Sequence, residues 1–188
     1  TGGGSGEAGV GRRESGAGSR KPGAGDGEAA GAAADVVASN PGDSVERFTR
    51  ELTALGGIVH VVPPGGVQAK IESLLAERSI THIQMGGDVP HVDGVSLGAA
   101  GIEAQRGPAE TIRAGLTGAL AGIAETGSIV LAGGHGRPLT ASLVPPIHIA
   151  VLDASQLVAT VAEALALPAV RECAAGAIVT GPSRTADI

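Results

Sequence analysis

The chain has 188 residues, a mass of 18.2 kDa and a formal net charge of −6, which leave room for one domain with a tail. An acidic chain with a single aromatic residue, Phe48, has no general affinity for nucleic acid or anionic lipid and almost no rings on which bases would stack. The lone Cys173 excludes an internal disulfide and favours a reducing, cytoplasmic location. No apolar run is long enough to cross a bilayer.

Residues 1–40 differ from the rest of the chain in composition. They hold 12 of the 32 glycines, and their only large apolar residues are Val10, Val36 and Val37. Such a segment buries too little surface to offset the entropy lost on ordering. We therefore predict a flexible Gly/Ala-rich tail over 1–40 and a folded domain over 41–188.

The first half of the predicted domain contains a strand–helix–strand unit. A helix starts at Asp43 or Ser44 and ends at Gly56, and it is followed by a β-branched run, a second apolar helical face and a second strand, over 58–62, 67–79 and 80–85. Because two strands joined through a helix at this spacing run in the same direction, the sheet is expected to be parallel.

The second half is less regular. A helix weakened by Gly115 and Gly118 is predicted over 110–120. It is followed by strands at 129–131 and 147–152, a helix over 154–165 that Pro168 stops, and a last strand at 177–180. The pattern as a whole predicts an α/β domain with a mainly parallel sheet.

Three patterns that look like functional motifs lack the context they need. The GxGxxG match at 4–9 has no strand before it and no helix after it. The GxSxG match at 94–98 has no convincing strand before Ser96. The loop 88–93 combines two carboxylates with His91, which are metal-ligand types, but its simpler interpretation is a solvated polar loop.

The segment Ala124-Glu125-Thr126-Gly127-Ser128 is a more specific candidate. Glu125 could orient a substrate hydroxyl or act as a base, and the hydroxyls of Thr126 and Ser128 could donate to an anionic oxygen. The alternative is a turn that needs a glycine with positive φ at Gly127.

The segment Gly181-Pro182-Ser183-Arg184-Thr185-Ala186-Asp187 directly follows the last predicted strand. Ligands bind at the carboxyl ends of strands in a parallel sheet. Arg184, between the hydroxyls of Ser183 and Thr185, offers a planar fork for a carboxylate or phosphate. Asp187 could instead pair with Arg184 and fix the loop, so anion binding and structural pairing both remain open.

With Leu143-Val144-Pro145-Pro146-Ile147-His148 between them, these two segments resemble the lactate-utilisation (LUD) domain family of the LutC/YkgG type. The resemblance is strong from about Gly115 to Ile188, extends less strongly back to Asp43, and excludes the tail over 1–40. The family usually has threonine at the position of Ser128, so the hydroxyl is kept. Family members continue past Asp187 with a further strand, which we expect the domain of 41–188 to lack.

The resemblance implies a three-layer α/β domain with the NagB/RpiA/CoA-transferase-like fold. It also implies a subunit that, with iron–sulfur-associated partners, oxidises L-lactate to pyruvate. This chain is expected to hold no cofactor and no metal, with the clusters on the partner subunits, and to bind neither nucleic acid nor membrane. Carried over, Glu125 is the expected catalytic residue, and the substrate-binding positions are Thr126, Gly127, Ser128, Gly181, Ser183, Arg184, Thr185 and Asp187.

Two alternatives accompany this interpretation. The domain could be a non-catalytic scaffold that docks the iron–sulfur partners, with motifs that only shape loops. By analogy of fold alone, it could be an enzyme that binds a sugar phosphate or a CoA ester. Only Lys21 and Lys70 could serve as lysine point charges for a phosphate, and neither lies near the motifs.

Overall fold

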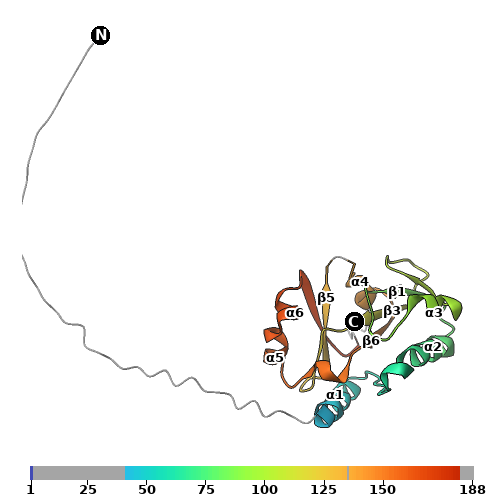
Figure 1. The fold of residues 1–188 in the computed structure, drawn as a ribbon, viewed down its shortest axis with the longest axis horizontal. Coiled ribbons are helices and arrows are strands. Elements are labelled where there is room, and N and C mark those ends of the chain that lie inside the picture. The colour runs from blue at the N-terminus through green and yellow to red at the C-terminus, as the bar shows by residue number, and fades with distance from the viewer. Residues whose placement is uncertain (2–40, 135, 183–188) are drawn as a thin grey trace, which may run out of the picture. The chain divides into compact units, whose positions relative to one another are not determined.

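The computed structural model describes residues 1, 41–134 and 136–182. The predicted tail (beyond Thr1), its GxGxxG match and the motif positions Ser183, Arg184, Thr185 and Asp187 lie outside the described residues. The described body is an α/β domain flanked by helices, as predicted, but its strands form two four-stranded sheets where a single mainly parallel sheet was expected (Figure 1). None of its described helices is long and apolar enough to span a bilayer.

Sheet A is wholly parallel, with strand order β2-β1-β3-β6. Its strands are β1 (His82–Met85), β2 (Glu103–Gln105), β3 (Ala114–Gly118) and β6 (Ile147–Val151). Helices α2 (Val67–Glu77), which follows the 3-10 turn η1 (Pro64–Gly66), and α3 (Gly94–Ala99) share one hydrophobic core with this sheet. The core is aliphatic, as a chain with one aromatic residue requires.

The opposite face of sheet A carries polar side chains beneath the short helix α4 (Thr140–Leu143). Gln84 is fully buried and donates to Thr140 Oγ1 at 2.8 Å, and Thr117 is paired with His148 at 2.8 Å. Burial lowers the pKa of His148, because desolvation disfavours the charged imidazolium. With helices on both faces, sheet A forms the middle of three layers.

The predicted helix over 110–120 is wrong, because this segment contains the central strand β3. The backbone of α4 lies so close that a Cβ at Gly115 would stand 1.6 Å from the carbonyl oxygen of Ala141. Glycine inside a strand often marks such a close approach, whereas propensity alone makes it look like a weak helix position.

Sheet B is mixed, with strand order β7-β4-β5-β8. Its strands are β4 (Ala121–Ile123), β5 (Ser128–Gly133), β7 (Leu157–Val158) and β8 (Ala175–Thr180). β5 is antiparallel to both β4 and β8, whereas β4 and β7 are parallel. The carboxyl ends of β4, β7 and β8 therefore share one edge with the amino end of β5.

Helices cover both faces of sheet B. α5 (Val161–Ala166) packs with Ala121, Ile123 and Val130, while α6 (Pro168–Arg171) adjoins α5, and these two helices lie side by side (Figure 1). α1 (Pro41–Ala54) takes the other face, where a Cβ at Gly122 would meet Phe48 at 3.2 Å. As predicted, α1 ends before a glycine with positive φ, Gly56 at +92°.

The predicted strand 58–62 is also wrong, since it forms no ladder with any described residue. Its β-branched side chains have the propensity of a strand, but pairing requires a partner edge. Ile58 and Val61 are each 72% exposed. The strand–helix–strand unit therefore lacks its first strand, although sheet A is parallel.

The predicted helix over 154–165 is divided into three elements. A capping box between Asp153 and Gln156 closes the 3-10 turn η2 (Ala154–Gln156), β7 then pairs with β4, and the Thr160 hydroxyl caps the start of α5. Leu165, predicted to face the core, is exposed. Pro168 does end α5, because it holds Leu167 in an extended conformation, but it also begins α6.

Candidate functional site

The first motif, Ala124–Ser128, forms the turn between β4 and β5 at the edge of sheet B. Gly127 has φ of +63°, so the predicted requirement for a positive-φ glycine is confirmed. A Cβ there would lie 2.3 Å from the backbone nitrogen of Leu52 in α1. The glycine therefore serves both the turn and the close approach of α1.

Three hydroxyl groups form a hydrogen-bonded chain beside this turn. Ser128 Oγ lies 2.7 Å from Thr126 Oγ1 and 2.7 Å from Thr180 Oγ1, which is the last residue of β8. Ser128 itself is 2% exposed, whereas Thr180 is exposed. The first motif and the residue that precedes the second motif are therefore in direct contact.

The Glu125 carboxylate is hydrogen-bonded to the start of α5. Its Oε1 accepts a hydrogen bond of 2.7 Å from the backbone amide of Val161, the first residue of α5. Its backbone amide donates to the carbonyl oxygen of Ala159 at 3.1 Å. The carboxylate thus satisfies one of the free amides at the start of a helix, where negative charge is favourable.

The described part of the second motif, Gly181 and Pro182, lies against the end of α1. Gly181 has φ of +71°, and a Cβ there would lie 2.9 Å from Leu55 Cβ. Pro182 Cγ is the atom nearest to a Cβ built at Gly56, at 3.7 Å. Both motifs therefore meet the last turns of α1, and the structure brings Glu125–Ser128 and Gly181 to one edge.

One protein-family model covers most of the chain. The model of the LUD domain matches residues 45–188, which span both motifs and the whole described body beyond the first residues of α1. The chain belongs to the LUD domain family.

The chain is also similar in fold to a solved structure and in part of its sequence to a curated protein. The chain is similar to the crystal structure of a DUF162 family protein from Deinococcus radiodurans, with a TM-score of 0.61 and 22% identity over 75% of this chain and 88% of that one. It is also 38% identical over 80 residues to an uncharacterised protein of Neisseria meningitidis serogroup B, covering 41% of this chain. The chain spans about a third of the length of that curated relative, 34%.

The loop 88–93, considered above as a metal loop, directs its side chains to separate partners. Asp93 caps α3 by accepting from Val95 and Ser96, and these hydrogen bonds, with that of the Ser96 hydroxyl first among them, lower the pKa of Asp93. His91 pairs with Asp153 at 2.7 Å. Within the described residues no three His, Cys, Asp or Glu side chains are grouped as metal ligands.

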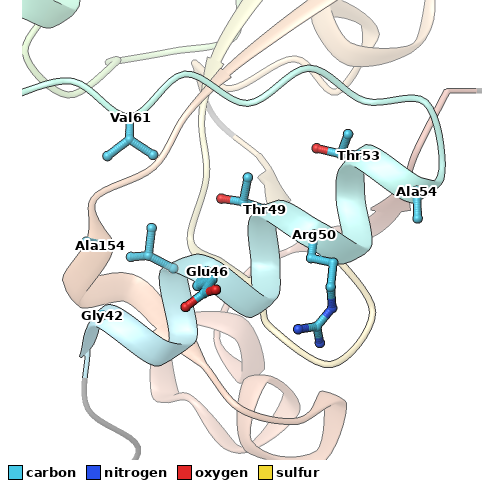
Figure 2. Close-up of a pocket in the computed structure, with 9 residues that line it drawn as sticks. Gly42, Glu46, Thr49, Arg50, Thr53, Ala54, Val61 and Ala154 are labelled. Carbon is cyan, nitrogen blue, oxygen red and sulfur yellow. The ribbon is translucent and has the colours of Figure 1, made fainter.

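Two hollows have linings that include none of the described motif residues. A groove of about 1030 Å³ runs beside α1 (Figure 2). Thr49 and Thr53 lie on the side of α1 that faces the segment carrying Val61, and Arg50 points away from it. Thr49 Oγ1 is buried without a hydrogen-bond partner in the described residues.

The second hollow is a cleft of about 520 Å³ at the carboxyl edge of sheet A. It is lined by the end of β5, by the loops that follow β1, β2, β3 and β5, and by α6 with the segment between α6 and β8. Two arginines, Arg106 and Arg137, contribute to it. Sequence patterns did not single out either arginine. The signal that was available is that Arg106 follows a short polar strand and Arg137 lies among glycines.

Proposed function

We propose that this LUD-domain protein is a subunit of a lactate-utilisation system that binds L-lactate or pyruvate at the motif edge of sheet B. The single observation that carries the proposal is the contact between Ser128 Oγ and Thr180 Oγ1, at 2.7 Å. It joins Ser128, and through it Thr126, to the residue directly before Gly181, where the second motif begins.

In this proposal the two motifs divide the recognition of a 2-hydroxy acid. Arg184 holds the carboxylate through two of its three guanidinium nitrogens, and Ser183 and Thr185 donate further hydrogen bonds. On the other side, Thr126 ends the hydroxyl chain that starts at Thr180. Because each hydroxyl donates once, the chain can leave one hydroxyl hydrogen directed at a bound oxygen. Gly127, Gly181 and Asp187 shape the two loops.

Glu125 is proposed to orient the 2-hydroxyl or accept its proton. Its Oε1 is occupied by Val161, which fixes the carboxyl group and leaves Oε2 for a ligand. The same hydrogen bond supports a purely structural role, so the two roles need separate readouts. The hydride or electrons would leave through a cofactor on iron–sulfur-associated partners in the cytoplasm.

The test is calorimetric titration of L-lactate and pyruvate into the wild-type chain and the Arg184→Ala variant. Arg171→Ala, an exposed arginine on α6, is the matched control. We expect Arg184→Ala to lose at least tenfold in affinity and Arg171→Ala to bind as the wild type does. Equal affinity in all three proteins would remove Arg184 from the proposed site.

A second candidate function is a docking subunit for the iron–sulfur partners. The observation that favours it is the extended segment 58–62, which exposes Ile58 and Val61 and forms no strand ladder with described residues. An exposed extended segment of this kind can accept a strand from a partner.

Co-purification distinguishes docking from lactate binding. The variant Ile58→Lys/Val61→Lys should abolish capture of the iron–sulfur-associated proteins of the same system, while Arg184→Ala should leave capture unchanged. Leu165→Lys, on the exposed side of α5, controls for the added charge. Capture that survives the double variant would rule out docking through this segment.

A further inference from the structure

We infer that the cleft between the carboxyl edge of sheet A and the end of β5 is a second, separate site, which binds a small molecule through a phosphate group held by Arg106 and Arg137. Among the residues that the structure describes, the lining of this cleft includes none of the motif edge of sheet B.

The position of the cleft in the fold is the first argument. β1 connects to β2 on one side of sheet A, whereas β3 connects onward to β6 on the other side. The chain after β1 (Gly87 and Asp88) and the chain after β3 (Leu120) both line the cleft. In open parallel sheets, the carboxyl ends of strands at such a reversal form the crevice in which ligands bind.

The second argument is that Arg137 is held in place but has no partner for its charge. The backbones of Gly134 and Arg137 exchange two hydrogen bonds, of 3.3 and 3.0 Å, which close a tight turn. A Cβ at Gly87, where φ is +101°, would lie 2.7 Å from Arg137 Cγ, so the arginine stem packs on this glycine. Among the described residues the Arg137 guanidinium forms no hydrogen bond and no ion pair.

Arg106 is fixed from both ends. Its Nη1 donates to the carbonyl oxygen of Gly136 at 2.7 Å, in the same turn that carries Arg137. Its own carbonyl oxygen accepts from Gln84 Nε2 at 3.0 Å. Its Nη2 is only loosely paired with Asp88, at 3.9 Å, and both side chains are exposed, so this pair contributes little. Most of the guanidinium donors of Arg106 remain available to a ligand.

Gln84 ties these arginine loops to the core of the domain. It is fully buried on β1 and donates to Arg106 O and to Thr140, which lies three residues after Arg137. Its Oε1 is buried without a partner in the described residues. The Gln84 amide nitrogen therefore holds both the chain at Arg106 and the start of α4, which follows Arg137, in fixed positions beside the cleft.

The chemistry of the lining identifies the ligand class. Two guanidinium groups match the double charge of a phosphate, whereas a single carboxylate is satisfied by one. The volume of about 520 Å³ is within the range of small-molecule sites and is large for a three-carbon acid. Asp88 and Glu172, which also line the cleft, can accept hydrogen bonds from hydroxyl groups on the rest of the ligand.

The test uses inorganic phosphate as the probe, with sodium chloride at matched ionic strength as the reference. Thermal unfolding and calorimetric titration would be measured for wild type, Arg106→Gln and Arg137→Gln. Arg113→Gln is the control, because this exposed arginine precedes β3 at the opposite edge of the same sheet. We expect phosphate to raise the melting temperature of wild type and Arg113→Gln, and to bind at least tenfold more weakly to the two cleft variants.

Three outcomes would overturn the inference. The wild type could fail to respond to millimolar phosphate, Arg137→Gln could bind phosphate as tightly as the wild type, or all three variants, including Arg113→Gln, could lose phosphate affinity equally. L-lactate is the second arm. Phosphate binding that needs Arg137 but not Arg184 supports the cleft whatever becomes of the proposed function. Lactate binding that needs Arg137 instead of Arg184, with no phosphate binding, would contradict both.

Discussion

The two edges of this domain that carry polar loops are built in opposite ways. At the motif edge of sheet B, Gly127 and Gly181 are pressed against α1, and the hydroxyls of Thr126, Ser128 and Thr180 satisfy one another. At the carboxyl edge of sheet A, the loops instead surround a cleft of about 520 Å³ with two arginines in its lining. The two sequence motifs therefore lie at the tightly packed edge of sheet B, whereas the cleft at sheet A is formed by loops in which the sequence showed no motif.

The comparison teaches that a motif can report packing as strongly as chemistry. The glycines of both motifs are explained by α1, and Glu125 is explained in part by α5. What packing does not explain is the hydroxyl chain that ends at exposed Thr180, next to the segment that carries Arg184.

The largest expected effect is on the packed edge. Gly127→Ala must combine a positive φ with a Cβ 2.3 Å from the backbone of Leu52. We expect it to lower the free energy of unfolding by at least about 3 kcal/mol. Gly107→Ala, beside Arg106 and with no atom within 4 Å of its Cβ, should change it by less than about 0.5 kcal/mol. Urea unfolding of both variants checks the contrast, and similar values would show that the two edges are equally tolerant.

A smaller effect is expected at the start of α5. Glu125→Ala removes the acceptor of the Val161 amide and should cost about 1–2 kcal/mol in urea unfolding. Glu125→Gln keeps an oxygen acceptor and should retain most of this stability. If lactate binding or turnover in the assembled system falls with Glu125→Gln while stability is retained, the charge acts on the ligand. If both variants unfold like wild type, the capping role is wrong.

Ser128→Ala tests the hydroxyl chain itself. Removing the central hydroxyl leaves Thr126 and Thr180 without their shared partner, so we expect a loss of about 1–2 kcal/mol. Ser142→Ala is a useful reference, since within the described part of the chain the Ser142 hydroxyl donates a single hydrogen bond, to the carbonyl oxygen of Leu139 just before α4. A change at Ser128 no larger than at Ser142 would mean that the chain of three hydroxyls adds no stability.

The smallest effect concerns pH. Burial lowers the pKa of His148 in the folded protein, so the unfolded chain binds the proton more readily. The stability from neutral His148 is complete above the unfolded pKa of about 6.5 and is lost as pH falls toward the folded value. His148→Gln should flatten the decline in unfolding free energy between about pH 7.5 and 5.5. The exposed His60→Gln should leave the decline unchanged, and equal slopes in wild type and His148→Gln would refute the assignment.

The sequence predicts the fold class and the elements with a clear hydrophobic period, including α1, α2, β5 and β8. It mistakes β3 for a helix because Gly115 marks a close approach of α4, and Gly118 a close approach of the loop at Asp88 and Pro90, which no local pattern shows. It predicts a strand over 58–62 because β-branched residues favour the extended conformation, but a strand also needs a neighbouring strand to pair with, and the described residues provide none.

The candidate site follows the same division. The turn at Gly127 is predictable, since a tight turn needs a glycine with positive φ. A contact between the first motif and the end of the last strand is also expected, because the resemblance to the LUD family rests on both segments. The contact of Glu125 with Val161 is not, because it depends on where α5 begins. Arg106 and Arg137 are far apart in the chain and are brought together by Gly87, Gly136 and Gln84, which no spacing rule links.

The most direct test of the two-edge account is one calorimetric series in which L-lactate and phosphate are each titrated into wild type, Arg184→Ala and Arg137→Gln. The account predicts that Arg184→Ala loses lactate binding and keeps phosphate binding, and that Arg137→Gln does the reverse. Loss of both ligands in the same variant, or of neither in either variant, would contradict it.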